Sequence, residues 1–194
     1  MTSTGGASSL EQQIRAAQAT LGSLTAHRDV LERAAAGIVA ALAAGGKLLA
    51  CGNGGSAAEA QHLVTELVGR YLSNRRSLPA VFLGGDAGMM SCIGNDFSFD
   101  DVFARPLSSL AAPGDLLVCF TTSGNPENVV RALEVARQLS IRSLALLGKD
   151  GGRARGLASW EVVVASADTA RIQEAHQFIL HWICDRVEEA FPAS

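Results

Sequence analysis

The chain has 194 residues, of which 48% are hydrophobic and 18% are charged, and its formal net charge at pH 7 is −3. This length suits one domain with a sizeable buried core, and this composition is typical of a folded globular protein rather than a disordered chain. The small negative charge argues against nucleic acid as a main partner, and the lack of a long apolar run or a signal-peptide pattern predicts a cytoplasmic protein without a membrane segment.

Two helices are expected at the N-terminal side. Ser8 and Glu11 have the spacing of a capping box, which predicts a helix that stops near Gly22. Helical periodicity resumes at Thr25 and predicts a second helix as far as Ala44. These N-terminal helices, about residues 8–44, precede the first apolar run.

Five short apolar runs then alternate with helical segments. The runs lack the alternation of a half-exposed strand, which favours parallel strands buried on both faces. They span residues 47–51, 80–84, 115–120, 143–148 and 161–166, and a last helix is expected from about Thr169 to Phe191. The pattern predicts a three-layer α/β/α sandwich with a mainly parallel five-stranded sheet, formed by one domain over residues 1–194. Cys51 and Cys119 lie in two of the runs, where free thiols are expected rather than a disulfide.

Two of the predicted strands end in turns rich in small polar residues. The first turn is Asn53-Gly54-Gly55-Ser56, and the second is Thr121-Thr122-Ser123-Gly124-Asn125, where Asn125 could cap a helix with Pro126 at its first position. Hydroxyls and backbone N–H groups at the carboxyl ends of parallel strands form a site for a phosphate, although such residues are also common in ordinary turns. Neither turn matches a nucleotide-binding fingerprint, so a small phosphorylated molecule is favoured over ATP or NAD.

Histidines and carboxylates on two helices are the candidates for chemistry. His62 and Glu66 are four residues apart on one helix face, where they could hold a divalent metal, act as a base with its partner, or form a solvated pair. On the last helix, His181 lies in an apolar stretch and could be a core residue. Gln173 is eight residues before it, about 12 Å along the helix axis, so a site that uses both residues would draw them from different subunits.

The segments CGNGGSAAEAQH, IGNDFSFDDVF, TTSGN, GKDGG and DTARIQEAH, in this order and with these gaps, resemble the sedoheptulose 7-phosphate isomerases, also called phosphoheptose isomerases, of the sugar isomerase (SIS) fold. The resemblance covers nearly the whole chain. It implies a homotetramer with active sites at subunit interfaces and a bound Zn²⁺. It also implies conversion of sedoheptulose 7-phosphate to D-glycero-D-manno-heptose 7-phosphate through an enediol, on the route to nucleotide-activated heptoses.

The chemistry of the reaction and the resemblance together give expected roles to individual residues. Glu66 is the expected base and His181 the expected acid, because enediol chemistry must move protons on both carbon and oxygen. The expected metal ligands are His62, Glu66, Gln173 and His181. The expected substrate-binding residues are Asn53, Gly54, Gly55, Ser56, Glu66, Asn95, Asp96, Thr121, Thr122, Ser123 and Gln173.

Two departures from the family pattern are visible. Pro126 stands where the family usually has a serine, which removes a hydroxyl and an N–H from the phosphate loop. Gly88 and Met89 replace residues of a hydroxyl-rich stretch. A non-catalytic SIS protein that binds the replication initiator DnaA is the alternative, but this chain retains His62, Glu66 and His181 together, which favours the enzyme.

Overall fold

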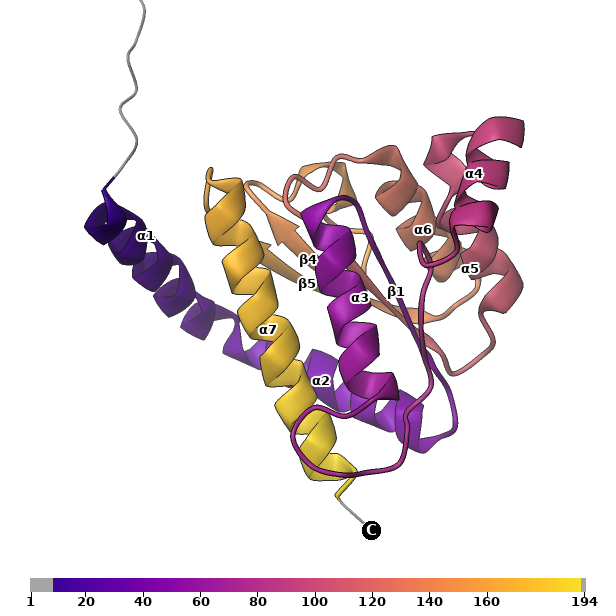
Figure 1. The fold of residues 1–194 in the computed structure, drawn as a ribbon, viewed down its shortest axis with the longest axis horizontal. Helices are drawn as coiled ribbons and strands as arrows, with labels where there is room; N and C mark the ends of the chain where they lie inside the picture. Colours follow the sequence, from indigo (N-terminus) through magenta and orange to yellow (C-terminus); the bar gives the residue numbers. More distant parts are fainter. Residues whose placement is uncertain (1–8, 193–194) are drawn as a thin grey trace, which may run out of the picture.

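The computed structural model describes residues 9–192, and its centre is a five-stranded sheet with helices on both faces (Figure 1). The strands lie in the order β2-β1-β3-β4-β5, and every neighbouring pair is parallel. Their bounds are β1 Leu48–Gly52, β2 Ala80–Phe82, β3 Leu116–Thr121, β4 Arg142–Gly148 and β5 Trp160–Val164. The predicted three-layer α/β/α sandwich is confirmed.

The apolar runs form strands because both faces of each central strand are buried. Along β1, Leu48 and Ala50 face one hydrophobic cluster, whereas Leu49 and Cys51 face the other. All five residues of β1 and all six of β3 are buried, so neither strand has a solvent-facing side that would favour alternating polar residues. The predicted free thiols are confirmed, and Cys51 and Cys119 lie on adjacent strands with their sulfur atoms 3.3 Å apart.

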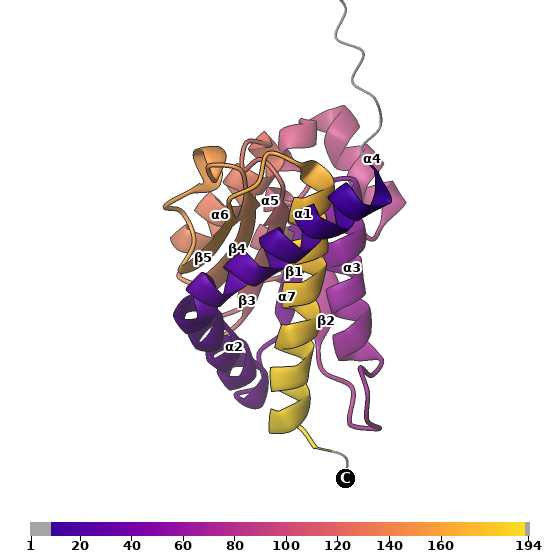
Figure 2. The same cartoon turned by 90° about the vertical axis from the view of Figure 1, so that its left-hand side faces the viewer.

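Each face of the sheet is covered by its own helices (Figures 1 and 2). One layer contains α2 (Arg28–Ala43), α3 (Gly55–Val68) and α7 (Thr169–Ala190). The opposite layer contains α4 (Ala87–Asp96), α5 (Ala104–Leu110) and α6 (Glu127–Gln138). Because α3 follows β1 directly and α7 contacts α3 along its length, the residues predicted to carry chemistry on these two helices share one layer.

The first helix, α1 (Leu10–Ser23), buries none of its residues and crosses α7 on the outside of the molecule (Figure 2). Its apolar side chains Leu10 and Ile14 are 69% and 47% exposed. An amphipathic helix with an uncovered apolar side has the character of a surface that packs against another chain.

Three predicted boundaries in the N-terminal helices were wrong. The capping box is formed by Ser9 and Gln12, because Ser9 is the residue whose side chain accepts from the Gln12 N–H while the Gln12 side chain accepts from Ser9; Ser8 lies outside the described residues. The first helix continues through Gly22 to Ser23. A 3₁₀ turn over Leu24–His27, with Leu24 buried in the core, then redirects the chain, so the second helix begins at Arg28.

The remaining boundaries differ less. The second strand is three residues long because a turn at Gly85, whose N–H donates to the Phe82 carbonyl, ends it before residue 84. The other four strands and the last helix agree with their predicted ranges to within two residues. Within residues 9–192, no helix combines the length and the apolar character that crossing a membrane requires.

Candidate functional site

The glycine turn after β1 is held in place from two sides. Gly54 has φ +57°, a backbone conformation that favours glycine, and its carbonyl accepts from the Ala57 and Ala58 N–H groups to begin α3. The Asn53 side chain exchanges two amide hydrogen bonds, of 2.8 and 2.9 Å, with buried Asn128 on α6. The turn therefore opens α3 at the carboxyl end of β1, as predicted, and is anchored to the opposite layer.

The hydroxyl-rich turn after β3 lies next to it, because β1 and β3 are paired up to Gly52 and Phe120. The Thr121 hydroxyl accepts from the Gly124 N–H at 3.1 Å, and the Ser123 hydroxyl accepts from the Asn125 N–H at 3.3 Å. A hydroxyl that accepts in this way keeps its own hydrogen for another acceptor. Ser123 is partly exposed and can donate to an anion that lies over the turn, whereas Thr121 is buried at the end of β3.

The predicted helix cap at Asn125 was wrong. The first helical residue of α6 is Glu127, the N-cap position is Pro126, and no side chain caps this helix. The Asn125 side-chain oxygen instead accepts from the Arg153 N–H at 3.2 Å. Asn125 thus joins the hydroxyl-rich turn to Arg153, directly after the GKDGG segment, and Gly124 packs so closely on that segment that a Cβ on it would collide with the Gly151 carbonyl.

A cluster of polar side chains lies between α3 and α7. His62 and Glu66 share one face of α3, with His62 Nε2 2.9 Å from Glu66 Oε1. The Gln177 side-chain nitrogen lies 2.9 Å from His62 Nδ1 and 3.0 Å from His181 Nε2. The two imidazole rings meet edge to face with centroids 5.1 Å apart, and Tyr71 stacks on His181. His181 is therefore part of the cluster and is not buried in the core.

Gln177 determines which nitrogen of each imidazole carries the proton. An amide nitrogen can only donate, so His62 Nδ1 and His181 Nε2 must be the nitrogens without a proton. His62 then carries its proton on Nε2 and donates it to Glu66. Sequence reasoning missed Gln177, although its spacing of four residues before His181 places both on one helix face.

Other predicted site residues lie away from this cluster. The Gln173 side chain packs on the glycine turn, where a Cβ on Gly55 would collide with it, and no hydrogen bond joins it to His62, Glu66 or His181. Asn95 and Asp96 are exposed at the end of α4 and hydrogen-bond to each other at 2.7 Å. Among residues 9–192, no three His, Cys, Asp or Glu side chains are grouped as they would be around a metal ion.

A buried pair behind the glycine turn was also missed. Glu59 of α3 and His176 of α7 approach to 3.9 Å, and the approaching atoms have no hydrogen-bond partner among the described residues. Burial raises the pKa of Glu59 to about 7, partly offset by a hydrogen bond from Ser56. Burial lowers the pKa of His176 to about 4, partly offset by the Leu147 carbonyl. Burial thus shifts both side chains towards the neutral form, as expected where little water reaches an ionisable group.

Comparison with known proteins places this architecture among sugar isomerase domains. The family model described as "SIS domain" matches residues 12–148. The phosphoheptose isomerase of Citrifermentans bemidjiense is 51% identical over 158 residues, covering 81% of this chain and 82% of that protein. The one from Campylobacter concisus is 44% identical over 182 residues, covering 94% of this chain and 96% of that protein.

A solved structure gives the same result in three dimensions. The phosphoheptose isomerase from Francisella tularensis superposes with a TM-score of 0.85 at 35% sequence identity, over 92% of this chain and 94% of that one. The similarity therefore extends over the sheet and both helical layers.

Proposed function

The chain belongs to the phosphoheptose isomerase family of SIS-domain proteins, and it is an aldose–ketose isomerase; from this premise we propose how its own residues carry out the reaction. The substrate is sedoheptulose 7-phosphate, and the product is D-glycero-D-manno-heptose 7-phosphate. The observation that carries the proposal is the convergence of His62, Glu66 and His181 from two helices, one of which begins at the glycine turn.

Glu66 is the proposed base. It removes a proton from C1 of the ketose and delivers it to C2, so an enediol forms and collapses without loss of any atom. The Glu66 side chain keeps 18% of its surface exposed, so a substrate can reach it, and His62 holds one of its oxygens. His181 is the proposed acid, which protonates O2 while O1 loses its proton.

The donor types in the cluster suit Zn²⁺, because two imidazoles and a carboxylate are ligands that this ion prefers. We propose that His62, Glu66, Gln173 and His181, contributed by more than one subunit, hold it, because within residues 9–192 of one chain no three such His or Glu side chains are grouped around an ion. When bound, the ion would polarise the substrate carbonyl as a Lewis acid. A carboxylate that binds a cation is a weaker base, so any test of Glu66 must record metal content as well as turnover.

The two turns are the proposed binding site for the phosphorylated end of the substrate. Thr121 and Ser123 each have a hydroxyl that accepts within the turn and keeps its own hydrogen; Thr121 ends β3, and Ser123 lies in the turn before α6. Thr122 and the glycine turn, with Ser56, complete the proposed contacts. Because Pro126 supplies no N–H, we assign a larger share of phosphate binding to these hydroxyls.

The proposed assembly is a homotetramer in the cytoplasm, with active sites at the interfaces. The exposed apolar side of α1 and the half-exposed Phe178 of α7 support an interface on this side of the molecule. Gln173 and His181 lie too far apart on one helix to reach one ion, which supports a site shared between subunits. Asn95 and Asp96, exposed on α4, are then free to face a neighbouring subunit's substrate.

Incubation of the purified protein with sedoheptulose 7-phosphate, followed by NMR, tests the function. Appearance of the aldose phosphate is the expected result. A well-folded oligomer that leaves the sugar unchanged but binds DnaA would instead identify the non-catalytic alternative.

A further inference from the structure

The loop between α3 and β2, residues 69–79, contacts the candidate site through Tyr71. The Tyr71 ring stacks on the His181 ring with centroids 5.8 Å apart and an angle of 27° between the planes. The stacked Tyr71 ring therefore limits the orientations available to His181.

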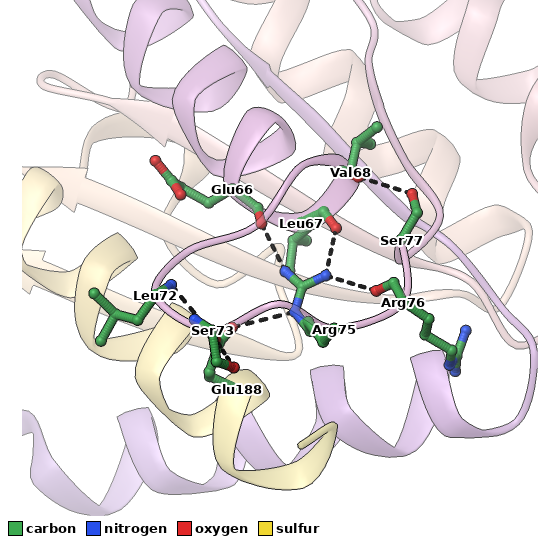
Figure 3. A network of polar contacts seen from close by, with 9 residues as sticks. All are labelled: Glu66, Leu67, Val68, Leu72, Ser73, Arg75, Arg76, Ser77 and Glu188. Carbon is green, nitrogen blue, oxygen red and sulfur yellow. Dashed lines mark hydrogen bonds and ion pairs between the residues drawn. The ribbon is translucent and has the colours of Figure 1, made fainter. Parts of the chain in front are cut away.

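Arg75 holds this loop to the end of α3 (Figure 3). Its guanidinium is buried and donates to the carbonyls of Glu66 at 2.6 Å, Leu67 at 2.9 Å and Arg76 at 2.9 Å. The last carbonyls of a helix have no partner within the helix, so these contacts cap α3. Glu66, the proposed base, is one of the two capped residues.

Glu188 of α7 completes the network from the other side (Figure 3). It accepts from Arg75 Nε at 3.2 Å, from the Leu72 N–H at 3.2 Å, and from the Ser73 N–H and hydroxyl. Burial alone would raise the pKa of Glu188, but these hydrogen bonds and the Arg75 charge lower it. Glu188 is seven residues after His181, so the network ends on the helix that carries the proposed acid.

We propose that Arg75 and Glu188 are positioning residues for the isomerisation, and that Tyr71 transmits their effect to His181. Arg75 holds the last turn of α3, where Glu66 lies, and Glu188 holds the same loop to α7. The distance and angle between base and acid are then set by one buried ion pair. This inference rests on the roles proposed above for Glu66 and His181. A displacement of about 1 Å between catalytic groups can cost about 100-fold in rate.

Three variants test the proposal. Arg75→Lys keeps the charge but cannot reach all four acceptors. Glu188→Gln keeps the shape but weakens each hydrogen bond that it accepts. Tyr71→Leu removes only the stacked ring, at a half-buried position where a smaller side chain is tolerated. This variant keeps the test informative if Arg75→Lys or Glu188→Gln fails to fold. Glu189→Gln, which removes an exposed carboxylate on the adjacent position of α7, is the matched control.

We expect kcat to fall roughly 10- to 100-fold in the three variants with KM changed by less than about threefold, because transition-state geometry is lost and ground-state binding is kept. Tyr71→Phe should regain most of the kcat that Tyr71→Leu loses. Glu189→Gln should match the wild type. Folded variants with lowered melting temperature but unchanged kcat would overturn the proposal, because the network would then serve stability alone.

A second measurement is independent of turnover. In ¹H–¹⁵N spectra of the imidazoles, the His181 signals, identified by their loss in His181→Gln, should shift in Tyr71→Leu and Arg75→Lys but not in Glu189→Gln. If the wild type does not isomerise the sugar, the proposed function fails, but these shifts still test whether Arg75 and Tyr71 position His181. Unmoved His181 signals in both variants would refute the positioning role.

Discussion

Replacement of Glu59 by Gln should change how the stability of the protein depends on pH. Burial raises the Glu59 pKa from 4.5 to about 7. The folded state therefore binds a proton that the unfolded chain releases at lower pH. This contribution is fully present below pH 4.5 and is lost as the pH rises to about 7.

The magnitude follows from the pKa difference. A change from 4.5 to about 7, at about 1.4 kcal/mol for each pH unit, corresponds to a loss of roughly 3 to 4 kcal/mol of unfolding free energy. His176 acts in the opposite direction, because its pKa is lowered to about 4 and stability is lost as the pH falls from 6.5 towards that value. In the wild type, the pH dependence that His176 contributes would therefore cancel part of the pH dependence that Glu59 contributes.

The difference in unfolding free energy between the wild type and Glu59→Gln, followed over pH, isolates the contribution of Glu59. Denaturant unfolding at pH 5, 6, 7 and 8, at fixed protein concentration and ionic strength, should show the wild type losing about 2 to 3 kcal/mol relative to the variant over this range. Glu189→Gln, an exposed carboxylate, should show a nearly constant difference over the same range. A constant difference for Glu59→Gln as well would refute a raised pKa of Glu59.

Four further predictions concern the site. Glu66→Gln, with metal content measured alongside, should lower turnover by roughly two to four orders of magnitude, and a near-normal rate would remove Glu66 as the base. Ser123→Ala should raise KM more than it lowers kcat in steady-state assays, and inorganic phosphate should compete with the substrate; failure to compete even at high concentration would argue against the turn as the phosphate site. Mixing an inactive Gln173→Ala variant with an inactive His181→Ala variant should restore some activity in hybrid oligomers, and confirmed subunit exchange without any recovery contradicts a shared site. In metal-free protein, ¹⁵N NMR should find His62 protonated on Nε2 and His181 on Nδ1, and Gln177→Leu should mix the tautomers; an unchanged pattern in that variant would mean that Gln177 does not select them.

Much of this architecture could be predicted from local patterns. Unbroken apolar runs indicate strands buried on both faces, and glycine and hydroxyl residues directly after them indicate the turns that lie at the carboxyl edge of the sheet. The four-residue spacing of His62 and Glu66 places them on one helix face whatever surrounds the helix. These features depend on backbone geometry and on neighbours close in sequence, so the order of residues determines them.

Contacts between distant segments were decided only by the tertiary structure. Arg75 and Glu188 are 113 residues apart, and Gln177 and His62 are 115 apart. Whether they meet depends on how α7 is rotated against α3. Side-chain packing over the whole layer sets that rotation, and no short pattern encodes it. The same holds for the Glu59–His176 pair, whose pKa values shift because two helices together bury it. The sequence by itself therefore determined the sheet, its two turns and the His62–Glu66 pair, and the packing of α7 on α3 decided which side chains surround them.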